Sequence, residues 1–168
     1  MLMMKKRMLM LLAAIAVCGT MFSQQVLTVV HATSDDGFVN VRSQPTMRSR
    51  VLTKVNMFSH GLGDGVLLGS KGNWSKVSVG RVTGWAYTKY LGTQNWYHGD
   101  GAPRLIARAH PTPLYRENYA DGEANIYFGS VPAGTILADR FEEYGEFYML
   151  TTAHDNLYIR KTDATVVE

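Results

Sequence analysis

The chain has 168 residues, with 17 Lys and Arg against 14 Asp and Glu, which gives a formal net charge of +3 at pH 7. Residues 1–23 contain three of the basic residues and no acid, so the rest of the chain carries 14 charges of each sign. This balance excludes a strongly basic chain of the kind that binds nucleic acid. The single cysteine, Cys18, lies in the same segment, so residues 24–168 form no disulfide and no thiolate metal site.

The N-terminal segment has the pattern of an export signal. Basic residues at positions 5–7 precede an apolar stretch, Met8 to Val17, that is too short to cross a bilayer as a helix. We predict a signal peptide over residues 1–23, with cleavage after Ser23. In an alternative interpretation, Ile15 to Cys18 resembles a lipobox and Cys18 carries a lipid anchor. Either signal predicts an exported, periplasmic or envelope-associated protein.

The sequence after residue 25 predicts an all-β protein. No window of about eleven residues has helical periodicity, and short apolar runs alternate with clusters of Gly, Asn, Asp and Ser. A single helical turn is predicted over Thr88 to Leu91. The strands predicted before it are Phe38 to Arg42, Arg50 to Val55, Gly65 to Gly69, Trp74 to Val79 and Val82 to Ala86.

A second set of strands repeats the first. An Arg-x-x-Pro-Thr core recurs at Arg42 and Arg108, 66 positions apart, and from Trp74 onward the copies align at an offset of 73. We therefore predict two β-domains, residues 32–92 and 104–168, joined by a linker over residues 93–103. The growth of the offset predicts an insertion in the second copy near Tyr115 to Gly122. Its predicted strands are Leu105 to Ala109, Ile126 to Val131, Thr135 to Asp139, Phe147 to Thr152 and Asn156 to Arg160.

Four short motifs of the first copy carry a family resemblance. They are Asn40-Val41-Arg42-Ser43-x-Pro45, Gly72-x-Trp74-Ser75-Lys76-Val77, Thr83-Gly84-Trp85-Ala86 and Tyr90-Leu91. Together they resemble the bacterial SH3-like (SH3b) domain, and the second copy resembles it through its alignment with the first. The resemblance implies two tandem small SH3-like β-barrels after the signal peptide, and peptidoglycan or peptide binding in the cell envelope. The segment from Asn56 to Gly65 is longer than the turn the family usually has there.

Strand alternation predicts which side chains point outward. Val77 and Val79 alternate with polar residues, and Trp74 shares the phase of the polar set. On the next predicted strand, Trp85 and Tyr87 alternate with small and apolar residues and also point outward. Three outward aromatics on adjacent strands form a candidate platform for sugar rings or extended peptides. The alternative is that a loop or the second domain covers these rings.

Two further features have both a structural and a functional interpretation. Arg42 either braces the loop that follows it, through loop carbonyls, or binds a ligand carboxylate, and its repetition at Arg108 favours bracing. Trp96, in the predicted linker, is interpreted as a contact that holds the two domains together.

The sequence contains no recognisable catalytic apparatus, so we predict a protein that is not an enzyme and that needs no cofactor. The pairs His98–Asp100 and His60–Asp64 are weak metal candidates, and no metal site is predicted. The acid pairs Asp35–Asp36 and Glu142–Glu143 are predicted to lie in turns as solvated charges. A hydrolase would need an acid pair such as Glu142 and Glu143 to line a pocket.

These observations predict a non-enzymatic, exported binding module that recognises peptidoglycan fragments or an extended peptide of an envelope partner. The alternative is a structural or regulatory protein–protein interaction module without a cell-wall ligand. That alternative rests on the opposite charges of residues 32–92, which carry +5, and residues 104–168, which carry −4. Oppositely charged halves either attract each other or face different partners.

Overall fold

The computed structural model describes residues 25–57, 63–96, 103–118, 120–151 and 156–168. The described chain is all-β, as the sequence predicts, and its only helical elements are two short 3-10 turns. The predicted signal peptide, the cleavage site and Cys18 lie outside the described residues. Among the described residues, no helix has the length and apolar character needed to span a membrane.

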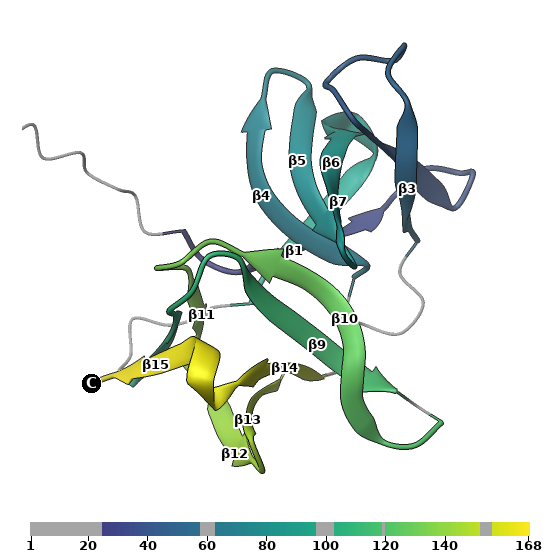
Figure 1. Ribbon diagram of the computed structural model, residues 1–168. Helices are drawn as coiled ribbons and strands as arrows, with labels where there is room; N and C mark the ends of the chain where they lie inside the picture. The colour runs from purple at the N-terminus through teal and green to yellow at the C-terminus, as the bar shows by residue number, and fades with distance from the viewer. Residues whose placement is uncertain (1–24, 58–62, 97–102, 119, 152–155) are drawn as a thin grey trace, which may run out of the picture.

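The first half, residues 25–96, forms one curled seven-stranded sheet with the order β3-β2-β6-β5-β4-β1-β7 (Figure 1). The 3-10 turn η1 (Thr88–Tyr90) connects β6 to β7. The strands are β1 (Thr28–Ala32), β2 (Phe38–Arg42), β3 (Val51–Asn56), β4 (Gly65–Lys71), β5 (Trp74–Val79), β6 (Val82–Tyr87) and β7 (Leu91–Asn95).

The second half, residues 103–168, forms a five-stranded sheet, β10-β9-β14-β13-β12, and a three-stranded sheet, β11-β8-β15. The 3-10 turn η2 (Lys161–Asp163) precedes the last strand. The strands are β8 (Arg104–Ala107), β9 (Thr112–Asn118), β10 (Glu123–Val131), β11 (Ile136–Ala138), β12 (Phe141–Tyr144), β13 (Phe147–Thr151), β14 (Asn156–Arg160) and β15 (Ala164–Val167).

Strand pairing in the second half follows the order of the first. The antiparallel pairs β2–β3, β2–β6, β5–β6 and β1–β7 correspond to β9–β10, β9–β14, β13–β14 and β8–β15. One strand differs: β4 pairs with both β1 and β5, whereas in the second half β11 pairs with β8 and β12 pairs with β13. The bend of β4 at a register shift between Leu67 and Gly69 is thus replaced by a break between two short strands.

The strand pairing corrects the alignment of the repeated Arg-x-x-Pro-Thr core. Arg42 ends β2 and pairs with Trp85, whereas the residue that pairs with Tyr158, the counterpart of Trp85, is Tyr115. Arg108 instead lies after β8, before the second copy's counterpart of β2 begins. The 66-residue spacing therefore relates residues on two non-equivalent loops, and the 73-residue offset holds from β2 onward. The predicted insertion near residues 115–122 is largely the strand β9 and its turn into β10.

The structure contains strands that the sequence did not predict, namely β1, β7, β9, β12 and β15. Residues 93–95, predicted as linker, continue β7 and pair with β1. Glu142 and Glu143 lie in β12 and not in a turn, so the prediction of a turn there is wrong. Backbone pairing with β13 holds these residues extended in spite of their exposed, acidic side chains.

Two apolar clusters form the core, and one of them draws on both halves. Adjacent residues of β1 contribute to both clusters, because neighbouring side chains on a strand point to opposite faces. Val30 packs in the cluster made only of first-half residues, and Val29 packs in the cluster shared with the second half. Leu27, Val66 and Trp96 also join that second cluster, which otherwise consists of second-half residues such as Leu157. The prediction that Trp96 holds the two halves together is confirmed.

The contact between the halves is apolar and hydrogen-bonded. Ser78 of β5 and Ser130 of β10 bond twice, through their hydroxyls at 3.3 Å and from the Ser130 amide to Ser78 Oγ at 3.0 Å. Within the described residues the only ion pair is Lys161–Glu143, which lies inside the second half. The contact between the described parts of the two halves therefore contains no ion pair.

Candidate ligand-binding groove

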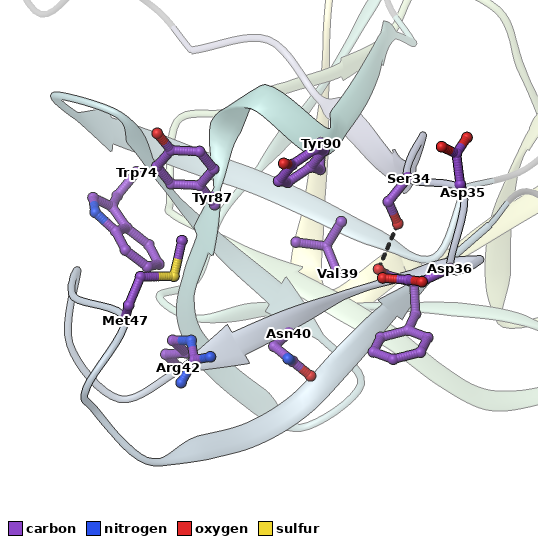
Figure 2. Close-up of a pocket in the computed structure, with 11 residues that line it drawn as sticks. Ser34, Asp35, Asp36, Val39, Asn40, Arg42, Met47, Trp74, Tyr87 and Tyr90 are labelled. Atoms are coloured by element: carbon purple, nitrogen blue, oxygen red, sulfur yellow. Dashed lines mark hydrogen bonds between the residues drawn. The ribbon is translucent and has the colours of Figure 1, made fainter.

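An open groove of about 360 Å³ lies on the first half, beside the ends of β2, β5 and β6 (Figure 2). Its residues come from four places: the β1–β2 turn, strand β2, the loop after β2, and the β5–β6 pair with η1. The lining residues are Ser34, Asp35, Asp36, Phe38, Val39, Asn40, Arg42, Met47, Trp74, Tyr87 and Tyr90.

Three aromatic rings form one wall of the groove. Trp74 and Tyr87 are directly paired across β5 and β6, and their ring centroids lie 5.4 Å apart in an edge-to-face arrangement. Tyr90 follows on η1, with its centroid 5.9 Å from that of Tyr87 and 41% of its surface exposed. The rings are partly covered by one another yet open to solvent, which suits stacking against a sugar ring or a planar peptide group.

The two ends of the groove differ in charge. Asp35 and Asp36 are exposed in the β1–β2 turn at one end, where the Ser34 hydroxyl fixes the turn by donating to the Phe38 carbonyl at 2.6 Å. Arg42 lies at the other end, beside Trp74 and Met47 (Figure 2). A ligand that lies along the aromatic wall therefore meets carboxylates at one end and a guanidinium at the other.

Arg42 makes the loop-bracing contact that the sequence favours. Its Nη1 donates to the Ser49 carbonyl at 2.8 Å, and the Ser49 hydroxyl donates to the carbonyls of Gln44, at 2.8 Å, and Thr46, at 3.0 Å. These bonds hold the loop that presents Met47, whose side chain is 56% exposed. Arg108 has no equivalent role, since its backbone amide donates to the Asp163 carbonyl and its side chain is exposed.

Of the four predicted site residues, the structure brings three together. Trp74, Tyr87 and Arg42 line the groove, whereas Trp85 does not; it is half-buried and lies opposite Lys76 on β5. Alternation alone does not separate Trp85 from Tyr87, because both point to the same face of β6. The sequence analysis missed Tyr90, and the signal for it was present: Tyr90 follows Tyr87 by three residues across the predicted turn.

A second groove, of about 570 Å³, lies at the corresponding position of the second half. At the 73-residue offset, Phe147 replaces Trp74, Arg160 replaces Tyr87 and Tyr115 replaces Arg42. The Arg160 guanidinium lies 5.9 Å from the ring centroids of both Tyr115 and Phe147. The second groove thus has the same place in its half as the first, but different side chains line it. The two grooves are therefore not equivalent binding sites.

Tyr158, the counterpart of Trp85, is buried and carries the one resolved pKa shift in the described chain. Burial, followed by the nearby Glu117 carboxylate, raises the pKa of Tyr158 above its ordinary value of 10.0. The folded state therefore resists loss of this proton, and the contribution of Tyr158 to stability is retained below pH 10.0 and lost as the pH rises above it.

We expect the free energy of unfolding to fall above pH 10.0, and to fall less in Tyr158→Phe, which has no phenolic proton. Denaturant unfolding at a series of alkaline pH values measures both slopes. Tyr90→Phe, at a position 41% exposed on the first half, is the matched control. Equal slopes in Tyr158→Phe and the wild type contradict the assignment.

The remaining candidates for chemistry do not converge. Glu142 and Glu143 are consecutive on β12, so their side chains point to opposite faces, and Glu143 pairs with Lys161 at 2.6 Å. Within the described residues, no three His, Cys, Asp or Glu side chains gather in a way that suits a metal ion. The candidates His60 and His98 lie outside the described residues. The Asp64 carboxylate instead accepts two bonds from Asn56, both at 2.8 Å.

No protein-family model matches the chain, and no curated protein is recognisably related to it.

Proposed function

We propose that the chain is a non-enzymatic binding module of the cell envelope, built from two tandem SH3-like β-barrels of the SH3b kind behind a signal peptide. The shared strand-pairing order of the halves supports the tandem arrangement. In each half a 3-10 turn precedes the last strand, and the first and last strands pair. The N-terminal sequence supports export to the periplasm or envelope, with Cys18 as the lipid attachment point if a lipoprotein signal is used.

The ligand that we propose for the groove is a peptidoglycan fragment or an extended peptide. The observation that carries this proposal is the aromatic wall of Trp74, Tyr87 and Tyr90 between two acids and one arginine. Peptidoglycan has sugar rings that stack on aromatics, and its stem peptides have both free amines and carboxylates. Such a ligand matches the aromatic wall and both charged ends of the groove.

The test is co-sedimentation of the purified protein with cell-wall sacculi. We expect saturable binding, and a loss of about tenfold or more in affinity for Trp74→Ala, because stacking on one aromatic ring, as nucleic-acid bases do, contributes about 1–3 kcal/mol. Trp85→Ala is the matched control, since it deletes the same side chain from the neighbouring strand, outside the groove. We expect this variant to bind as the wild type does.

Equal losses in the two variants would contradict the groove as the site. An absence of saturable binding by the wild type would contradict the proposal of a cell-wall ligand. It would favour the alternative, a structural or regulatory interaction module. One observation supports that alternative: charged side chains of both halves are exposed, such as Lys71 and Lys76 of the first half and Glu142 and Glu146 of the second. Far-UV circular dichroism of both variants distinguishes a lost site from a lost fold.

A further inference from the structure

A cleft of about 390 Å³ lies between the two halves, away from the groove of Trp74. The first half contributes residues from β4, β5, β6 and the β5–β6 turn; the second contributes the segment before β9 and the end of β10. The lining residues are Leu68, Lys76, Arg81, Thr83, His110, Pro111, Tyr127, Ser130, Val131 and Pro132.

The polar lining of this cleft consists of donors and hydroxyls, with no acid. Lys76 and Arg81 carry positive charge, and His110 offers an imidazole N–H. The only ion pair among the described residues lies elsewhere, so none of these three side chains has a carboxylate partner in the described chain. The hydroxyls of Thr83 and Ser130 add two further groups able to donate.

The lining residues of the two halves are held in a fixed relation. The Gly80 amide, next to Arg81, donates to the Phe128 carbonyl of β10 at 2.9 Å. Ser78 and Ser130 bond twice across the same junction. Gly129 permits this approach, because a Cβ at that position would stand 3.0 Å from the Ser78 carbonyl oxygen. The backbone segments that carry the donors are therefore positioned before any ligand binds, which lowers the entropy that binding costs.

The floor of the cleft is apolar and aromatic. Leu68 packs against the shared core, Val131 is buried, and the Arg81 guanidinium lies 4.7 Å from the centroid of the Tyr127 ring. A ligand that fits this cleft therefore has an anionic group for the donors and an organic body for the floor. The charged and imidazole donors come from three separate segments of the two halves, which suits the several oxygens of a phosphate better than a planar carboxylate.

We propose that the cleft between the halves is an anion site for a phosphate ester, with Lys76, Arg81 and His110 binding the phosphate group and Tyr127 contacting the organic body. This site is separate from the groove of Trp74 and does not depend on the proposed function. Arg81 is the central residue of this site, because its guanidinium is both a charged donor in the cleft and a neighbour of the Tyr127 ring.

The test is a titration of the full chain with phenyl phosphate, inorganic phosphate and acetate at matched ionic strength, followed by backbone amide chemical shifts. We expect saturable shifts at Lys76, Thr83 and Ser130 with both phosphates and none with acetate. Phenyl phosphate is expected to bind more tightly than inorganic phosphate, because only the ester has a body that contacts Tyr127. Equal affinities would identify a site for free phosphate and would overturn the role given to the floor.

Substitutions separate a site from general charge attraction. We expect Lys76→Gln and Arg81→Gln each to weaken phenyl phosphate binding about tenfold, the effect of losing one charge-assisted hydrogen bond. Lys71→Gln is the matched control, since it removes the same charge from the exposed end of β4 and lines none of the clefts described above. Equal weakening by Lys71→Gln, or shifts by acetate equal to those by phosphate, would overturn the proposal.

Discussion

Trp96→Ala is expected to lower the free energy of unfolding by about 3–5 kcal/mol, the range for deleting a large aromatic from a core. Trp96 is 3% exposed and lies in the cluster that both halves share. Its removal leaves a cavity in a cluster that contains first-half residues such as Leu27 and second-half residues such as Leu105. Guanidinium unfolding followed by far-UV circular dichroism measures the loss.

Trp85→Ala is the control for this experiment, because Trp85 is a half-buried tryptophan outside the shared cluster. We expect a smaller loss from it. The shape of the transition adds a second test: since the cluster belongs to both halves, unfolding is expected to remain a single transition in the wild type. Two separate transitions, with only one moved by Trp96→Ala, would show that the halves unfold independently.

Gly84→Ala is expected to cost about 1–3 kcal/mol or more, as overpacking of a closely packed site does. A Cβ at Gly84 would stand 2.6 Å from the Arg42 carbonyl oxygen and 2.7 Å from Val41 Cγ1. These atoms belong to β2, which pairs with β6 at Arg42 and Trp85. Relief of the clash therefore requires the two strands to separate, and side-chain rotation alone does not provide it.

Gly92→Ala is the matched control, since Gly92 is also a strand glycine whose added Cβ would meet a neighbour. That neighbour is the His31 imidazole, a side chain and not backbone, so we expect a smaller loss. Thermal unfolding of both variants measures the difference. An equal loss of stability in the two variants would show that the β2 backbone moves away from an added Cβ as readily as a side chain does. Because β6 also carries Tyr87, Gly84→Ala is expected to weaken sacculus binding as well.

Strands with a clear alternation and a turn at each end could be predicted from the sequence. β2, β5 and β14 have the predicted boundaries. Apolar and polar residues alternate along β2 and β5, whereas β14 is a short buried apolar run bounded by polar residues. β1 gave no such signal, because its consecutive valines, Val29 and Val30, are both buried and face different clusters. β12 was missed for the opposite reason: it is acidic and largely exposed at the edge of its sheet.

The candidate groove could be predicted only in part. Alternation within β5 and β6 identified Trp74 and Tyr87, since that pattern is local to each strand. Asp35, Asp36 and Met47 join them through loops whose position depends on how β2 packs beside β6, which is a long-range property. The cleft between the halves could not be predicted for the same reason, because its two sides come from segments far apart in the sequence.

The pairing of the first and last strands of each half determines how late in synthesis that half can complete its fold. β1 pairs with β7, and β8 pairs with β15, so each half needs its final strand before its first strand has all its partners. Contacts between residues so distant along the chain form late, and the unpaired strands stay open to misassociation until then. Leu27, near the start of the described chain, packs in one cluster with Ala164, near its end. The cluster that the two halves share therefore stays incomplete until the last strand of the second half, β15, has been made.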